Sequence, residues 1–204
     1  VFLFLLDGPI AGPNIGGQLI DPFLQVAPPN RFAVDAGDDD LAAAIIYAAD
    51  MGARIINMSW GDPQYAPLLA DAVDYACSRG VLLVAAAGNQ ASARAFYPAR
   101  LDQTVAVSAA RADGRMALFS SWGPSTDLSA PGAAIWSTEP GGGYGQRSGT
   151  SMAAAHVTGV AARLLARHPE LQPEELRSAL AVAAARSSGG PWTPHLGAGL
   201  VRLD

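Results

Sequence analysis

The segment from Ser148 to Glu170 begins with a turn, Ser148-Gly149-Thr150, and continues as a run of small and apolar residues typical of a helix. Ser151 lies in the first turn of this expected helix, where backbone N–H groups lack helical acceptors and the helix dipole is positive. A hydroxyl at such a position can act as a nucleophile, because negative charge that develops on a neighbouring carbonyl oxygen is stabilised there. The arrangement favours acyl transfer through a covalent serine intermediate.

A serine nucleophile needs a general base within about 2.6–3.2 Å of its oxygen. The chain has three histidines, His156, His168 and His195, and all of them follow Ser151 in the sequence. On one α-helix His156 would point roughly 140° away from Ser151 and lie about 7.5 Å further along the axis. We therefore expect His156 to be a buried histidine bonded to the sheet, His168 to cap a helix end, and His195 to lie in a loop.

Strands and helices alternate along the chain, which predicts a mostly parallel sheet with helices on both faces. The apolar run at residues 1–6 is typical of a buried parallel strand. Ligands of such sheets bind at the carboxyl ends of the strands, so Asp7, Ser59–Gly61 and Asn89 should lie on one edge. The expected strands are 1–6, 31–35, 53–61, 81–89 and 104–110, and the expected helices are 40–52 with an Asp cap, 65–80, the helix after Gly149, and 172–185.

Length and composition limit the classes of protein. The chain has 204 residues, half of them hydrophobic, which suits one globular domain spanning 1–204. A net charge of −5 and the absence of a basic run argue against nucleic-acid binding. No apolar run is long enough to span a membrane, no signal peptide is visible, and the three histidines show no metal-ligand spacing. Compartment and oligomeric state are left open.

Four segments together carry a family resemblance: "RIINMSWG", "VLLVAAAGN", "FSSWGPSTDLSAPG" and "SGTSMAAAHVTGVAA". In order and approximate spacing they resemble the subtilisin-like serine proteases (subtilases), from about Val26 to the C-terminus. The resemblance implies a three-layer α/β subtilisin-like fold. It also implies an endopeptidase that cleaves polypeptide or peptide substrates through an acyl-enzyme on Ser151. Subtilases often bind calcium, but no calcium site can be mapped onto this chain.

The resemblance gives roles to two strand ends. Asn89 would donate its side-chain amide to the oxyanion, next to Gly88 in the substrate site, although an Asn in a Gly-Asn turn can also simply bond its own backbone. Ser59, Trp60 and Gly61 match the segment that pairs with an extended substrate as an added strand. The alternative for that segment is an ordinary strand end.

Asp7 matches the catalytic aspartate at the end of the family's first long strand. Its Asp-Gly-Pro setting is similar to that of subtilases that mature ribosomally made peptides, such as the cyanobactin proteases. The alternative is an Asp that serves only the turn before Gly8-Pro9.

The expected histidine is missing. In subtilases the general base lies in a His-Gly-Thr motif on a helix between the Asp strand and a Val-Ala-Pro segment. Here Val26-Ala27-Pro28 is present, but no histidine lies between Asp7 and Val26. The domain therefore lacks the histidine-bearing segment, between about residues 10 and 25. A carboxylate base is conceivable, but Asp38–Asp40 sit at a helix start, where a capping role is simpler.

Three interpretations follow. The chain is a serine endopeptidase domain whose histidine segment is absent from the sequence as given, or an inactive pseudo-subtilase that binds or scaffolds peptides. The third is a non-peptidase α/β enzyme that uses Ser151 with another base. The first fits the intact Ser151 and Asn89 motifs and Asp7, and the second fits the absence of the histidine from the sequence. Both rank well ahead of the third.

Overall fold

The computed structural model describes residues 2–6, 25–26, 37–139, 142–188 and 192–201. Six of its strands form a sheet in the order β2-β1-β3-β4-β5-β6, and β7 and β8 pair as a separate ribbon. The strands are β1 (Phe2–Leu6), β2 (Gln25–Val26), β3 (Ala53–Met58), β4 (Leu82–Ala86), β5 (Thr104–Ala110), β6 (Leu128–Pro131), β7 (Ile135–Thr138) and β8 (Tyr144–Arg147). The helices are α1 (Asp38–Asp50), α2 (Pro67–Ser78), α3 (Thr150–Arg167) and α4 (Pro173–Ser188).

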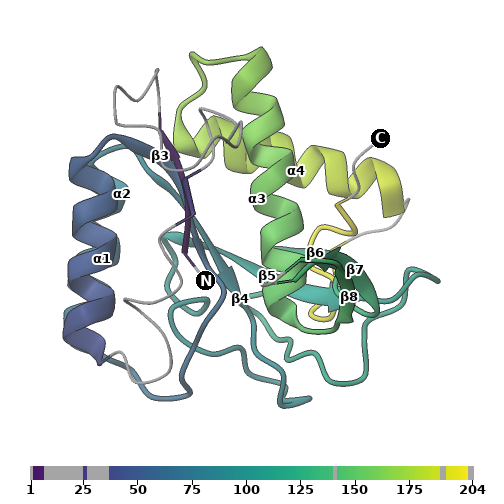
Figure 1. The fold of residues 1–204 in the computed structure, drawn as a ribbon. Helices are drawn as coiled ribbons and strands as arrows, with labels where there is room; N and C mark the ends of the chain where they lie inside the picture. The colour runs from purple at the N-terminus through teal and green to yellow at the C-terminus, as the bar shows by residue number, and fades with distance from the viewer. Residues whose placement is uncertain (1, 7–24, 27–36, 140–141, 189–191, 202–204) are drawn as a thin grey trace.

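The elements form three layers, as predicted. Helices α1 and α2 cover one face of the sheet, and α3 and α4 cover the other (Figure 1). Successive side chains of a strand point to opposite faces, so each strand supplies both layers. On β3, Ile56 packs with α1 and α2, whereas Ile55 packs toward α3. Since β3, β4 and β5 have both faces covered, they read as continuous apolar runs.

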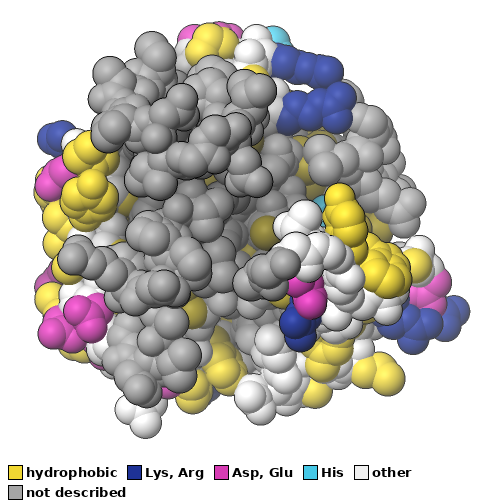
Figure 2. Space-filling model, viewed as in Figure 1, with side chains coloured by type: hydrophobic (Ala, Val, Ile, Leu, Met, Phe, Trp, Pro, Cys, Tyr) yellow, Lys and Arg dark blue, Asp and Glu magenta, His cyan; other side chains and the backbone are white. Residues whose placement is uncertain are grey.

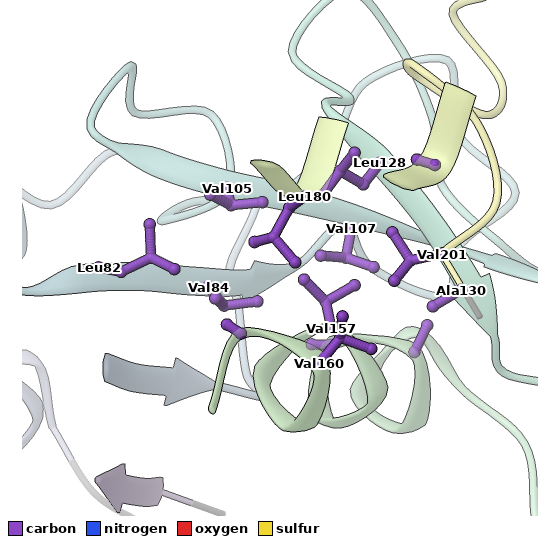
Figure 3. Packing of buried hydrophobic residues seen from close by; sticks show 14 of the residues in the cluster. Leu82, Val84, Val105, Val107, Leu128, Ala130, Val157, Val160, Leu180 and Val201 are labelled. Carbon is purple, nitrogen blue, oxygen red and sulfur yellow. The ribbon is translucent and has the colours of Figure 1, made fainter. Parts of the chain in front are cut away.

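The layer between the sheet and α3 contains mostly branched aliphatic side chains (Figure 3). Val157 and Val160 of α3 point toward Val84 and Val107 on the strands, and Leu180 of α4 closes the cluster. These side chains are at most 8% exposed. Helix α3 is thereby fixed across β3 to β6, and its first turn is held at the carboxyl ends of the strands.

Strands β3, β4, β5 and β6 are parallel, which confirms the mostly parallel sheet. Strand β1 departs from the prediction because it runs antiparallel to β3, with Phe2 opposite Met58 and Leu6 opposite Ala53. A continuous apolar run fits either direction, since burial on both faces sets the pattern and strand direction does not. The expected strand at 31–35 lies outside the described residues.

The start of α1 also differs from the prediction. The N-cap is Gly37 and makes no side-chain capping bond, so Asp40 is not the cap. Asp38, Asp39 and Asp40 instead occupy the first helical turn, where their negative charges favour the positive end of the helix dipole. In Figure 2, acidic side chains gather over this end of α1, at the lower left.

Among the described residues, no helix is both long enough and apolar enough to cross a membrane. Cys77, the only cysteine, lies on α2 partly buried against the α1–α2 core, where burial raises the pKa of its thiol. Cys77 thus packs as a small hydrophobic side chain.

The first turn of α3 approaches the sheet closely at Gly132, just after β6. The Gly132 carbonyl accepts a hydrogen bond from the Gly149 N–H at 2.8 Å. A Cβ atom on Gly132 would lie 2.6 Å from the Ala109 Cβ and 2.9 Å from the Gly149 carbonyl oxygen. Only a residue without a side chain lets the helix start sit this close to β5 and β6.

Gly132→Ala is therefore expected to lower the free energy of unfolding by about 1–3 kcal/mol, because the new methyl group must displace backbone. Gly159→Ala is the matched control, since Gly159 is exposed on α3 and a Cβ there meets nothing within 4 Å. The control should stabilise by up to about 1 kcal/mol through helix propensity. Urea unfolding followed by circular dichroism measures both, and an unchanged midpoint for Gly132→Ala would contradict the close approach.

Candidate active site

Ser151 and Ser59 are joined by a reciprocal pair of hydrogen bonds. The Ser151 hydroxyl donates to the Ser59 carbonyl oxygen at 3.1 Å, and the Ser59 hydroxyl donates to the Ser151 carbonyl oxygen at 3.0 Å. Ser59 immediately follows β3, whereas Ser151 lies in the first turn of α3. The pair therefore joins a strand end to a helix start, and it confirms that these two sequence motifs lie side by side.

A series of hydrogen bonds between side chains continues from Ser59 into the core. The Asn57 amide nitrogen donates to the Ser59 hydroxyl oxygen at 2.8 Å, and the Asn57 amide oxygen accepts from the Thr158 hydroxyl at 3.1 Å. Asn57 is 2% exposed and Thr158 is fully buried. Both amide atoms of Asn57 are thus used to fix Ser59 against α3, at a residue about two turns beyond the helix start.

The sequence analysis missed Asn57 and Thr158. A signal was present, because Asn57 stands between Ile56 and Met58 in a strand buried on both faces, where polar side chains are rare. Such a residue needs a buried partner. Its partner, Thr158, lies 101 positions away on another element and could not be inferred from local pattern.

Asn89 caps α3 from another part of the chain. Its amide oxygen accepts hydrogen bonds from the Thr150 N–H at 2.8 Å and from the Thr150 hydroxyl at 3.1 Å. The Thr150 oxygen in turn accepts from the Gly88 N–H at 3.1 Å. The helix's own N-cap, Gly149, has no side chain to accept these donors. Asn89 therefore supplies the capping oxygen from the loop after β4.

This capping role sets the direction of the Asn89 amide. Because Oδ1 faces the two donors of Thr150, Nδ2 points the other way. It lies 3.5 Å from the position that a Cβ on Gly149 would take, beside the residues that lead into Ser151. Asn89 is an exposed residue. The geometry places two donors, Nδ2 and the Ser151 N–H, at the same helix start.

Gly88 is required by backbone conformation. Its φ is +108°, in the region that L side chains rarely adopt, and a Cβ there would lie 3.1 Å from the Phe96 ring and 3.2 Å from the Ser121 hydroxyl. The turn that carries Asn89 to Thr150 thus depends on glycine at position 88.

The Ser59–Gly61 segment borders a cavity. Gly61 lies close to the chain at Tyr97, because a Cβ on Gly61 would be 2.9 Å from the Tyr97 carbonyl oxygen. Trp60 packs partly against the α1–α2 core and also lines a cavity of about 420 Å³. Trp60 therefore both packs inward and forms part of the cavity wall.

The three histidines have other contacts. His156 Nδ1 lies 3.0 Å from the Met152 carbonyl oxygen of its own helix, so the expected bond to the sheet is wrong. His168 is the C-cap residue of α3, as predicted, and its ring lies 3.6 Å from Glu170. His195 lies in a C-terminal loop, and the centre of its ring is 4.3 Å from that of Trp122, with the two ring planes tilted by 51°.

Asp7 lies outside the described residues, so its predicted place beside Ser151 is not observed. Its neighbour in sequence, Leu6, pairs with Ala53 at the beginning of β3, whereas Ser59 follows the end of that strand. Among the described residues, no group of three His, Cys, Asp or Glu side chains is placed to hold a metal ion.

Comparison with known proteins agrees with this geometry. Residues 22–199 match the model of the subtilase family of peptidases. The chain belongs to the subtilase family of serine proteases.

Relatives and solved structures are consistent with this assignment. The chain is 40% identical to fervidolysin of Fervidobacterium pennivorans, over 82% of this chain and 27% of that protein. It is 42% identical to subtilisin E of Bacillus subtilis (strain 168), over 67% of this chain and 37% of that protein. Its fold matches sphericase with a TM-score of 0.76 and 36% identity, over 83% of this chain and 65% of that chain.

The prenylagaramide maturation protease PagA matches with a TM-score of 0.74 and 31% identity, over 84% of this chain and 68% of that chain. This match confirms the predicted resemblance to maturation proteases. The chain covers only part of its curated relatives: 27% of the length of fervidolysin and 60% of the length of subtilisin DY of Bacillus licheniformis.

The side-chain hydrogen bonds of Asn57 lead to a prediction about the stability of the fold. Asn57→Ala leaves the hydroxyls of Ser59 and Thr158 without their amide partner inside the protein. The free energy of unfolding should fall by about 1–3 kcal/mol. Gln90→Ala, at an exposed position, is the control and should change stability by less than about 0.5 kcal/mol. Equal urea midpoints for the two variants would show that the buried amide contributes nothing.

Proposed function

We propose that the chain is part of a single subtilisin-like endopeptidase domain that hydrolyses peptide bonds through an acyl-enzyme on Ser151. The observation that carries the proposal is the Asn89–Thr150 contact, because it orients an exposed amide beside the nucleophile at a helix start. The family membership supports peptide bonds as the target. The general-base histidine is missing from the sequence as given.

Each residue has one step in the proposed reaction. The Ser151 oxygen attacks the scissile carbonyl while its proton passes to the histidine that this sequence lacks, and the negative charge that forms on the carbonyl oxygen is stabilised by Asn89 Nδ2 and the Ser151 N–H. The C–N bond then breaks, the leaving amine takes that proton, and water hydrolyses the acyl group from Ser151. The substrate lies extended along Ser59, Trp60 and Gly61, and pairs with their backbone as an added strand. Gly88 keeps the Asn89 turn in place. Asp7 would orient the absent histidine.

A specific contact favours a second candidate, an inactive pseudo-subtilase that binds peptides. The Ser151 hydroxyl donates to the Ser59 carbonyl oxygen, an acceptor that takes no proton at neutral pH. In subtilisin itself, loss of the histidine alone lowers kcat about 2 × 10⁶-fold. An oxyanion hole without the triad leaves only about 10³–10⁴-fold acceleration over water. The chain alone would then still pair with peptides along Ser59–Gly61, here called the peptide edge, but would not cleave them at a useful rate.

The two candidates make one shared prediction for the chain as written. Without an adjacent base, the Ser151 hydroxyl stays protonated at neutral pH. The purified chain should therefore neither cleave casein nor react rapidly with a fluorophosphonate probe. Labelling is measured by in-gel fluorescence over time, beside Ser151→Ala.

Rapid labelling that disappears in Ser151→Ala would contradict this prediction and identify a base within the chain. His195→Ala and His168→Ala would then locate it. The same assay separates the two candidates when a longer natural chain is used. Labelling that appears only in a chain with a histidine between Asp7 and Val26 supports the endopeptidase, and its absence there supports the pseudo-subtilase.

A further inference from the structure

The cavity beside Trp60 is lined by acidic as well as aromatic and apolar side chains. Its volume is about 420 Å³, and its walls come from α1, from the loop after β3, from the start of α2 and from Tyr97. The lining residues are Asp38, Leu41, Trp60, Gly61, Asp62, Gln64, Tyr65, Ala66, Leu69 and Tyr97. Two carboxylates and three aromatic rings lie among them, and no arginine does.

Two tyrosine rings form one wall of the cavity. The rings of Tyr65 and Tyr97 meet edge to face, with centroids 5.2 Å apart and planes at 68°. Arg100 lies outside the lining, with its guanidinium 4.5 Å from the centre of the Tyr97 ring. The Tyr97 ring thus already makes a cation–π contact with Arg100.

Asp62 is fixed beside that wall. Its backbone makes two hydrogen bonds with Tyr97: the Asp62 N–H donates to the Tyr97 carbonyl at 3.0 Å, and the Tyr97 N–H donates to the Asp62 carbonyl at 2.8 Å. One carboxylate oxygen accepts the Gln64 N–H at 2.7 Å, so the side chain is held in a turn. Asp38 approaches the cavity from the first turn of α1. Asp38 and Asp62 are exposed, as an electrostatic rim requires.

From these contacts we propose that the cavity selects a basic side chain, arginine or lysine, of the peptide that pairs with Ser59–Gly61. This inference rests on the proposed function, because the substrate strand is what brings a side chain over Trp60 and Asp62. The charged end of the side chain lies between the carboxylates of Asp38 and Asp62. Its methylene stem lies against Trp60 and Leu69, since long basic side chains cover apolar surface while their charged end stays at a polar rim.

A purely apolar occupant fits the cavity less well. A leucine or phenylalanine side chain would fill the wall but would withdraw solvent from two carboxylates without compensating them. An acidic side chain would be repelled by both. Aromatic faces and carboxylates together favour cations, and the net charge of −5 adds to that preference.

The test measures binding, so it does not need a working catalytic base. Fluorescein-labelled eight-residue peptides are made alanine-rich, with arginine, citrulline or norleucine placed at each position in turn. Citrulline keeps the shape of arginine and removes the charge. Fluorescence polarisation at low salt should show arginine binding about tenfold more tightly than citrulline at one or two neighbouring positions and nowhere else. Added salt should reduce the difference.

Matched substitutions assign the preference to the cavity. Asp62→Asn keeps the oxygen that accepts the Gln64 N–H and removes only the charge, and Asp38→Asn does the same on α1. Each should reduce the arginine preference several-fold while leaving citrulline binding unchanged. Asp39→Asn, one residue away and outside the lining, removes the same charge and should leave the preference intact.

The outcomes are distinct. Equal binding of arginine, citrulline and norleucine peptides would overturn the basic-side-chain inference and leave the proposed peptide edge standing. An equal loss in Asp39→Asn and Asp62→Asn would also overturn it, because net charge and not the cavity would then be the cause. If no peptide binds at all, the peptide edge itself fails, and the inference fails with it.

Discussion

The start of α3 depends on hydrogen bonds that its own sequence cannot provide. The first N–H groups of a helix need acceptors from elsewhere, and the buried Thr150 cannot reach water. Gly149, the N-cap residue, has no side chain, so Asn89 supplies the oxygen. The requirement to satisfy one buried N–H thereby draws the loop after β4 to the helix start. The exposed amide nitrogen of Asn89 is positioned as a consequence.

Close packing enforces the same arrangement from the other side. Gly132 lets the helix start approach β5 and β6, and the Gly149 N–H bonds the Gly132 carbonyl. Ser59 then meets Ser151 at the end of β3, fixed from below by Asn57 and Thr158. Three strand ends are thus tied to a single helical turn. A small displacement of α3 would strain several of these contacts together, because a packed interior deforms little.

Local pattern was sufficient for the elements that form the site. The buried strands β3, β4 and β5 are apolar runs in the sequence, and α3 is a long segment of mostly small and apolar residues. These patterns predicted the elements and the edge of the sheet at which the strand ends meet the start of α3. Features that depend on long-range partners did not follow. The pairing of Asn57 with Thr158 and the direction of β1 depend on residues far away in the chain. The cap of α1 was misjudged because the dipole favours acidic residues within the first turn as well as at the cap.

The contacts that build the proposed oxyanion and peptide edges all lie between Asn57 and Thr158. They connect β3, β4 and α3, and within the part of the chain that the structure describes none of them includes a residue before α1. The parts of the proposed site that require only fixed dipoles and backbone hydrogen bonds can therefore be held by β3, β4 and α3 alone. A chain can keep the first without the second, because an amide held by a helix cap remains oriented whether or not a base is present. For this reason the proposed peptide recognition and the proposed peptide cleavage can be measured independently.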